Sequence, residues 1–233
     1  MALMLSIETA TPVCSVVLAD GPDILGIRET AEKNSHSQVV SVFIDDILRE
    51  NGIEPKDLSA VAVSMGPGSY TGLRIGVSTA KGLCYALNKP LIAIGTLDAM
   101  ASGMRSMAGE DAALPLLYAP MIDARRMEVY TALFDAQGRK VRDTMAEIID
   151  AGSFSEFRSG HIICYAGDGA GKCTEVLGPP HFRYIGDFTV SARYMVQPAL
   201  EKFNGGLFED TAYFEPYYLK DFVAGIPKVK GLR

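Results

Sequence analysis

The chain has little material for metal or redox chemistry. Its 233 residues include only three His and four Cys. His36, His161 and His181 contain no pair spaced three or four residues apart, so the usual helical metal-binding pattern is absent. The cysteines are widely separated, with no Cys-x-x-Cys, which favours free thiols in a reducing compartment. We therefore expect no metal site and a cytoplasmic location.

Basic charge is also scarce. Lys and Arg number 22 against 28 Asp and Glu, which gives a net charge of −6. This balance disfavours tight, independent binding to nucleic acid. No stretch reaches about 18 consecutive apolar residues, so we expect no membrane span. The first twenty residues lack a positively charged start and carry Glu8 within the apolar run, so we expect no secretory signal.

Strand-like and helix-like patterns alternate along the chain, which is typical of α/β architecture. The expected strands are 3–7, 15–19, 24–29, 58–65, 91–94, 114–121, 128–134 and 162–166. One expected helix is capped by Ser35 or Ser37 and ends near 50, a second spans about 71–87, and a third begins at Thr96 or Asp98 and ends near 107. The order of elements recurs roughly in both halves, with a boundary expected near 109–113.

The most informative segment, from Gly66 to Leu83, is a glycine-rich turn followed by a helix. In one interpretation, Gly66 and Gly68 bring backbone N–H groups and the helix N-terminus to a phosphate. In the other, the glycines only permit a tight strand-to-helix turn. The segment matches neither Gly-x-x-x-x-Gly-Lys-Ser/Thr nor Gly-x-Gly-x-x-Gly, so neither nucleotide motif is present.

Small residues form a stripe along this helix, because Gly72, Gly76 and Ala80 are spaced four residues apart. A glycine inside a helix costs roughly 1 kcal/mol relative to alanine, so we expect a compensating close approach of another backbone. Packing within the chain and packing against a partner helix are both consistent with the pattern. The apolar residues that flank the stripe are Leu73, Ile75 and Val77.

Charged residues outside this segment also admit two interpretations. Glu8, at the end of the first strand, could hold Mg²⁺ through water or bond the backbone of its own turn. Asp123, Arg125, Arg126 and Glu128 lie between two strands and could recognise phosphate or form ordinary surface ion pairs. No Gly-x-Ser-x-Gly occurs, so no nucleophile elbow is predicted.

Four segments together resemble the TsaB family, also called YeaZ, which is required for threonylcarbamoyladenosine formation on tRNA. They are Ile7–Thr11, Asn34–Gln38, Gly66–Leu83 and Asp123–Tyr130, with weaker matches at Gly167–Ala170 and Pro216–Leu219. The resemblance implies an actin-like, Hsp70-like (ASKHA) fold of two lobes, each a mixed sheet flanked by helices. The implied lobes are 1–108 and 109–204. A C-terminal helix at about 205–222, centred on 210–218, would return to the first lobe.

The resemblance also implies a role. Members of this family are taken as non-catalytic partners of TsaD that work with the ATPase TsaE, contact tRNA only through the complex and self-associate through the same helices. No catalytic residue is then expected. The partner face would lie on helices 38–50 and 71–87, and its expected residues are Phe43, Ile47, Gly72, Leu73, Ile75, Gly76, Val77 and Ala80. On this basis, Gly76→Leu or Ala80→Arg would abolish TsaD binding without unfolding the chain.

The same resemblance argues against a cofactor held by this chain alone. Glu8 stands where actin-like folds carry Asp, and Thr9 and Ala10 stand where they place a glycine after the acid. Only weak nucleotide contacts are expected, from Glu8, Thr9, Gly66 and Gly68, with ATP bound only in the assembled complex. One alternative is an independent nucleotide-dependent transferase or glycoprotease-like peptidase. Another is direct tRNA contact within the complex through a patch of basic residues, namely Arg125, Arg126, Arg139, Lys140 and Arg142.

Overall fold

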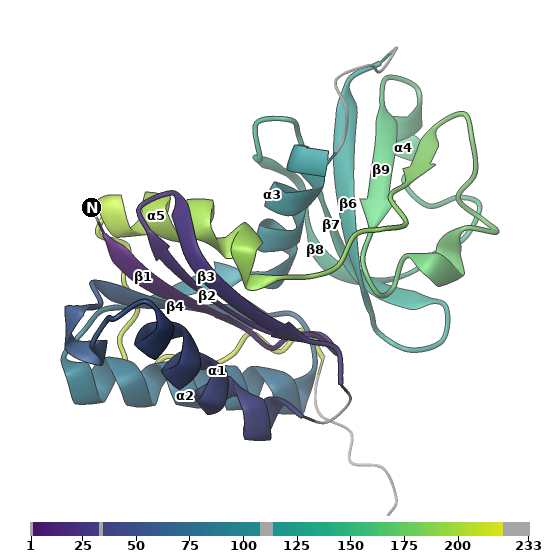
Figure 1. Ribbon diagram of the computed structural model, residues 1–233. Coiled ribbons are helices and arrows are strands. Elements are labelled where there is room, and N and C mark those ends of the chain that lie inside the picture. Colours follow the sequence, from purple (N-terminus) through teal and green to yellow (C-terminus); the bar gives the residue numbers. More distant parts are fainter. Residues whose placement is uncertain (1, 33–34, 108–113, 221–233) are drawn as a thin grey trace, which may run out of the picture.

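Two five-stranded sheets form two lobes in the computed structural model, which describes residues 2–32, 35–107 and 114–220 (Figure 1). The first sheet has the order β3-β2-β1-β4-β5 and the second the order β10-β9-β6-β7-β8. The strands of the first sheet are β1 Leu3–Glu8, β2 Cys14–Asp20, β3 Asp23–Thr30, β4 Ala60–Gly66 and β5 Leu91–Gly95. Those of the second are β6 Leu116–Asp123, β7 Glu128–Phe134, β8 Lys140–Ile148, β9 Ile162–Ala166 and β10 Phe182–Tyr184.

The two sheets have the same topology. In the first, β1, β2 and β3 form an antiparallel meander, and β4 and β5 then add in parallel beside β1. In the second, β6, β7 and β8 form the meander, and β9 and β10 add in parallel beside β6. The recurrence predicted from the sequence is therefore confirmed. The protein has the expected two-lobed, actin-like α/β fold.

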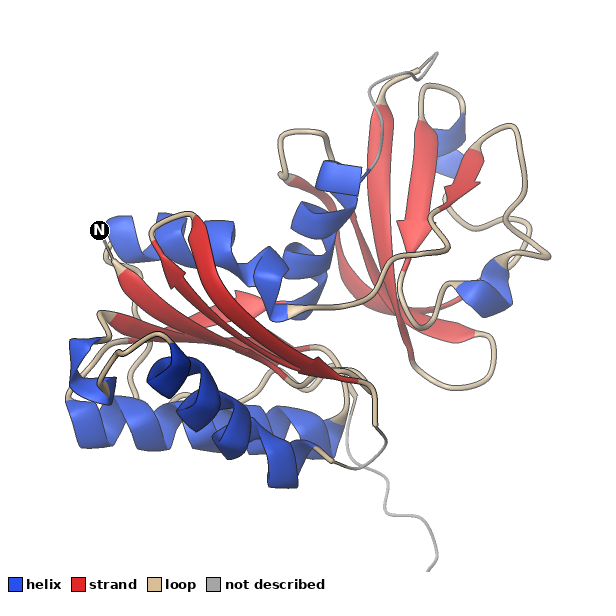
Figure 2. Ribbon diagram, viewed as in Figure 1, coloured by secondary structure: helices blue, strands red, loops and turns tan. Residues whose placement is uncertain are grey.

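Helices cover both faces of the first sheet (Figure 2). α1 His36–Glu50 and α2 Tyr70–Leu87 lie on one face, and α5 Val196–Asn204 lies on the other. α3 Thr96–Met107 packs against the second sheet through Leu97, Met100 and Met104. In the second lobe, the short helix α4 Ser155–Arg158 and the 3₁₀ turn η2 Gly171–Cys173 replace long crossover helices. Two further 3₁₀ turns are η1 Pro55–Asp57 and η3 Ala192–Met195.

Burial explains why β1 and β4 were recognised, and exposure or short length explains why β8 and β10 were not. β1 and β4 are buried along nearly their whole length between helices on both faces, so they appear as continuous apolar runs. The expected bounds of β7 and β9 are confirmed. No strand was predicted at the positions of β8 and β10. β8 is an edge strand with many exposed polar residues, and β10 has only three residues.

The positions at which the helices begin were predicted, but the expected capping hydrogen bond at α1 is absent among the residues that the structure describes. Ser35 occupies the N-cap position of α1, but its hydroxyl donates to the carbonyl oxygen of Glu32 at 2.7 Å and makes no capping bond. Thr96 is the first residue of α3. None of the described helices is long and apolar enough to traverse a bilayer.

The expected C-terminal helix at about 205–222 is wrong for the described residues. The last helix is α5, and residues 205–220 form turns and an extended segment. Gly205 and Gly206 end α5, with Gly206 at a φ of +66°, and Pro216 cannot donate a helical hydrogen bond. The segment nevertheless returns to the first lobe, where Glu209 N donates to Leu91 O at 2.9 Å and Tyr217 N to Met65 O at 2.7 Å.

The division into lobes also differs from the expected ranges. The expected boundary near 109–113 lies outside the described residues. η3 and α5, which were expected to close the second lobe, instead pack on the first sheet. Ala192, Met195 and Val196 share a core with Met4 and Val17. The chain therefore crosses back to the first lobe before residue 192.

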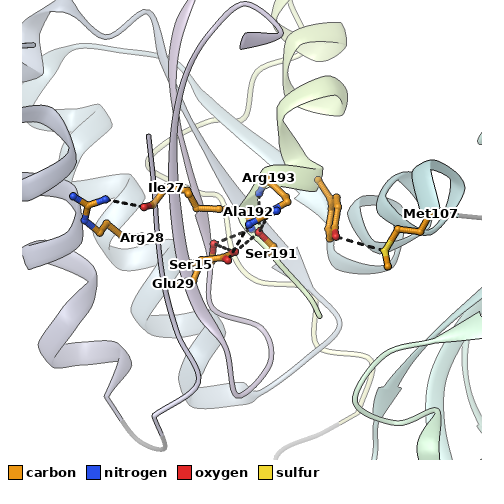
Figure 3. A network of polar contacts seen from close by, with 9 residues as sticks. Ser15, Ile27, Arg28, Glu29, Met107, Ser191, Ala192 and Arg193 are labelled. Carbon is orange, nitrogen blue, oxygen red and sulfur yellow. Dashed lines mark hydrogen bonds and ion pairs between the residues drawn. The ribbon is translucent and has the colours of Figure 1, made fainter. Parts of the chain in front are cut away.

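A polar network holds this return crossing in place (Figure 3). The Glu29 carboxylate, at the end of edge strand β3, accepts hydrogen bonds from Ser15 Oγ at 3.0 Å and from Ser191 Oγ. It also pairs with Arg193 at 3.2 Å. Ser15 Oγ in turn accepts from Ala192 N at 3.1 Å. One carboxylate thus ties the start of η3 to two strands of the first sheet.

We expect Glu29→Ala to lower the free energy of unfolding by about 1–2 kcal/mol, because it leaves Ser15, Ser191 and Arg193 without this acceptor. Glu32→Ala is the matched control, since exposed surface substitutions usually change stability by less than about 0.5 kcal/mol. Urea unfolding followed by circular dichroism measures both. Equal effects of the two substitutions would contradict a fastening role for Glu29.

Candidate functional site

The turn that follows Glu8 and the turn from Gly66 to Gly68 were the two predicted sites of weak nucleotide contact. These two turns pack directly against each other. Ser69 N donates to Ala10 O at 2.7 Å, and a Cβ on Gly68 would lie 2.4 Å from that same oxygen. Gly66 has a φ of +113°, and a Cβ there would lie 2.5 Å from Tyr217 O. The space beside each glycine is thus filled by this chain's own backbone. This geometry favours the tight-turn interpretation of both glycines over phosphate binding.

Glu8 is fully buried at the end of β1 and bonds its own turn. Its Oε1 accepts from Ala10 N at 2.6 Å, while its Oε2 has no partner among the described residues. Burial raises the pKa of Glu8 to about 7, although hydrogen bonds from the Ala10 backbone and the Ser64 side chain act in the opposite direction. The neighbouring Thr9 is also buried, and its hydroxyl has no partner among the described residues. The Glu8 carboxyl group therefore bonds the backbone of its own turn, as one of the two interpretations of this residue predicted.

The small stripe on α2 faces the chain's own sheet, which corrects the expected partner face. A Cβ on Gly72 would lie 2.1 Å from Thr9 O, and one on Gly76 would lie 2.2 Å from Thr9 Oγ1. Six of the eight expected interface residues are buried, namely Ile47, Gly72, Leu73, Gly76, Val77 and Ala80. Only Phe43 and Ile75 are partly exposed. Gly76→Leu and Ala80→Arg are therefore expected to disturb the fold itself, because Thr9 fills the space beside Gly76 and Ala80 is fully buried.

The opposite face of α2 is exposed and carries few charged residues. Its exposed residues are Thr71, Arg74, Ser78, Gly82, Tyr85 and Ala86, and the Arg74 guanidinium donates to the Tyr218 hydroxyl at 3.2 Å. Tyr85 is 86% exposed, and Val42 on the adjacent α1 is 52% exposed. The single charged residue between Ile75 and Leu87 is Lys81, whose ammonium turns aside to the carbonyl oxygens of Ala212 and Phe214. We call the outward sides of α1 and α2, defined by Val42, Phe43, Ile75, Ser78, Gly82 and Tyr85, the helix-pair face.

Gly82 distinguishes this face from an ordinary helix surface. A Cβ added to Gly82 would meet nothing within 4 Å. Gly82 therefore carries the roughly 1 kcal/mol penalty of a helical glycine with no packing contact to offset it among the described residues. The sequence signal was the three glycines of this helix, but the pattern alone could not tell which of them faced outward.

A cavity of about 460 Å³ with a mixed polar and apolar lining lies between α3, α5 and the turn that joins β7 to β8. Side chains of both charges line it, including Asp98, Arg105, Glu201 and Lys202. No residue of the sequence-predicted sites is among those that line it. Within the described part of the chain, no three His, Cys, Asp or Glu side chains gather in a way that could hold a metal ion.

The five basic residues of the predicted RNA patch do not form one patch. Arg125 and Arg126 lie in the turn before β7, whereas Arg139 and Lys140 lie beyond its other end, and the seven-residue strand spans roughly 20 Å. The three later residues are also paired, Arg139 with Asp135, Lys140 with Asp98 and Arg142 with Glu147. Of the five, only Arg125 and Arg126 have no ion-pair partner among the described residues.

Comparisons with known proteins agree with this fold. The sequence profile of the family described as "TsaD: tRNA N6-adenosine threonylcarbamoyltransferase" matches residues 23–157. The tRNA threonylcarbamoyladenosine biosynthesis protein TsaB of Bacillus subtilis is 34% identical over 131 residues, which are 56% of this chain and 54% of that protein. TsaB of Escherichia coli is 37% identical over 129 residues, 55% of this chain and 53% of the relative.

A solved structure extends the similarity to nearly the whole chain. The structure of YeaZ from Pseudomonas aeruginosa superposes with a TM-score of 0.82 and 25% sequence identity, and the match covers 94% of this chain and 100% of that one. The sequence matches are shorter, since the chain spans about half the length of the curated relatives it matches. Their names place these relatives in tRNA threonylcarbamoyladenosine biosynthesis.

Proposed function

This chain belongs to the TsaB (YeaZ) family, within the wider family described by the TsaD profile, and from that premise we propose that it is a non-catalytic partner subunit of a TsaD-type transferase. In this role it supports the formation of threonylcarbamoyladenosine on tRNA, in the cytoplasm, together with the ATPase TsaE. Its contact with tRNA is made through the complex.

The observation that carries the proposal is the helix-pair face. Its exposed residues Val42, Gly82 and Tyr85 are small, apolar or aromatic, and such residues suit close packing against another helix. The two helices also expose charged residues, including Asp45, Arg49 and Arg74. Gly82 lets a partner backbone approach α2 closely, and such an approach would offset the cost of a glycine inside the helix. Val42 and Tyr85 supply apolar and aromatic area that is exposed in the isolated chain. The proposed face thus lies on the two helices predicted from the sequence. It shares Phe43 and Ile75 with the expected partner face, but its other residues lie on the outward sides of the helices.

We also propose that this chain binds no nucleotide cofactor by itself and that ATP binds only in the assembled complex. Support comes from Glu8, Gly66 and Gly68, which are engaged with the backbone of their own chain. A calorimetric titration of the isolated chain with ATP and Mg²⁺ is expected to give no saturable binding. Micromolar affinity with turnover would instead favour an independent nucleotide-dependent enzyme.

Gly82→Arg is expected to weaken the complex with TsaD at least tenfold, which corresponds to about 1.4 kcal/mol, because a long charged side chain would stand where the partner helix packs. The free chain should stay folded, since the added side chain enters open space. Gel filtration with light scattering, applied to mixtures of the two proteins, measures the complex.

Gly178→Arg is the matched control for this experiment. Gly178 is exposed in the second lobe, and a Cβ added there also meets nothing within 4 Å. This control variant should bind TsaD as the unchanged chain does. Undiminished binding by Gly82→Arg would overturn the helix-pair face as the docking surface. Loss of self-association without loss of TsaD binding would assign the face to a second copy of this chain.

A further inference from the structure

The turn between β6 and β7 presents two arginines in an unfavourable backbone conformation. Arg125 has a φ of +74° and Arg126 a φ of +52°. The hairpin is closed by hydrogen bonds of 3.1 Å from Glu128 N to Arg125 O and from Ala124 N to Glu128 O. Two consecutive left-handed residues at a hairpin tip are normally Gly, Asn or Asp. Arginine at these positions costs on the order of 1 kcal/mol each, so turn formation does not explain the choice of residue.

The acidic neighbours of this turn are occupied by lysines. Lys172 pairs with Asp123 and donates to Glu128 O at 2.7 Å, and Lys220 pairs with Glu128. These contacts come from η2 and from the returning C-terminal segment. The carboxylates of Asp123 and Glu128 are therefore neutralised by groups other than the arginines.

The two guanidinium groups remain available for an external anion. Arg125 and Arg126 are both exposed, and neither has an ion-pair partner among the described residues. This contrasts with Arg139, Lys140 and Arg142, each of which is paired within the chain. In a protein with a net charge of −6, the tip is thus a local site of uncompensated positive charge.

We propose that Arg125 and Arg126 contact the phosphate backbone of the RNA that the assembled complex modifies. Guanidinium groups bind phosphate oxygens through paired, charge-assisted hydrogen bonds. A protruding hairpin tip suits a backbone with successive phosphates, whereas a mononucleotide is usually held in a concave pocket. The described cavity between α3, α5 and the β7–β8 turn does not include the tip residues. This inference rests on the proposed function, because the RNA reaches the chain through the complex.

Two arginine–phosphate contacts would mainly orient the RNA on the complex, and they would supply only a small part of the binding affinity. Each phosphate contact contributes a slope of about 0.7–0.9 to the dependence of log affinity on log salt concentration. A chain with this net charge would not retain RNA through two contacts alone. The expected site is therefore one part of a surface that a partner completes.

The test uses the assembled complex with a TsaD-type partner and a tRNA transcript, and the variant is Arg125→Asn combined with Arg126→Gly. These residues suit the left-handed turn, so the variant chain should be at least as stable as the unchanged one. We expect RNA affinity at low salt to fall about five- to tenfold and the salt slope to decrease by about 1–2. Arg139→Gln, which removes an arginine already paired with Asp135, is the control and should change neither.

The outcomes separate this inference from the proposed function. Light scattering of the same samples reports whether the complex forms. An intact complex with unchanged affinity and salt slope would overturn the role of the tip while leaving the partner-subunit function in place. Failure of the unchanged chain to form the complex would overturn both. Displacement of tRNA by millimolar AMP from the unchanged complex, absent in the variant, would assign the tip to a mononucleotide and overturn the RNA contact.

Discussion

Gly72→Ala is expected to lower the free energy of unfolding by about 3 kcal/mol, as overpacking against a rigid neighbour does. The added methyl group would lie 2.1 Å from Thr9 O, a backbone atom of the buried turn after β1. A flexible side chain could move aside at little cost, but this carbonyl is fixed between β1 and β2. The helix must therefore shift away from the sheet, which disrupts packing along α2.

Gly82→Ala provides a control in the same helix with the opposite sign. Its methyl group meets nothing within 4 Å, so the substitution should raise the free energy of unfolding by up to about 1 kcal/mol through helix propensity. Urea unfolding of the two variants measures both effects. A small or stabilising effect of Gly72→Ala would contradict the placement of the small stripe against the sheet and would reopen it as a partner surface.

Glu8→Gln is expected to remove a pH dependence of stability worth about 3 kcal/mol. The pKa of Glu8 is raised from 4.5 to about 7 by burial, a shift of about 2.5 units at about 1.36 kcal/mol per unit. Glutamine keeps an oxygen that can accept from Ala10 N, but it carries no charge to desolvate. The substitution therefore isolates the cost of burying the carboxylate.

The direction follows from proton binding. Below pH 4.5 the carboxyl group is protonated in both states and contributes no pH dependence. Between about pH 4.5 and 7 the unfolded chain loses this proton while the folded chain keeps it, so stability falls as pH rises. Above pH 7 the loss is complete. Stability should thus be retained at low pH and lost as pH increases.

Urea unfolding of both proteins at pH 4.5, 6 and 8 measures this effect. The stability of Glu8→Gln relative to the unchanged chain should grow by about 3 kcal/mol across that range. Other titrating groups are common to both proteins and cancel in the difference. A constant difference would mean that the pKa of Glu8 is the same in the folded and unfolded chain, and would require a cation or donor near its Oε2 to offset the burial.

Local patterns were sufficient to predict most of the architecture. Apolar runs identified the buried strands β1, β4 and β9, the helical spacing of apolar residues identified α1, and the glycine-rich turn before α2 identified that helix. Edge strand β8 was missed because its exposed polar residues leave no apolar run, and the helix expected at about 205–222 was wrong because two glycines and Pro216 outweigh the surrounding pattern. The two-lobed fold was predicted from the resemblance and from the recurring order of elements.

The candidate site was predicted at the level of the element and not of the residue. The sequence placed partner binding on α1 and α2, whose exposed residues include Val42 and Tyr85. The predicted partner face was the buried stripe, because Gly72, Gly76 and Ala80 repeat at helical spacing and Gly82 does not extend that repeat. The same glycine stripe fits a partner helix or the chain's own sheet, so the periodicity could not distinguish them.

The sequence by itself determined which segments are strands and helices, since apolar periodicity and turn residues act over a few neighbouring positions. It also determined the family, because several motifs together are specific. Only the tertiary structure decided that Thr9 fills the space beside Gly72 and Gly76, that Gly82 faces outward, and that Arg139 is paired while Arg125 is not. These properties depend on contacts between segments far apart in the chain, which local patterns do not specify.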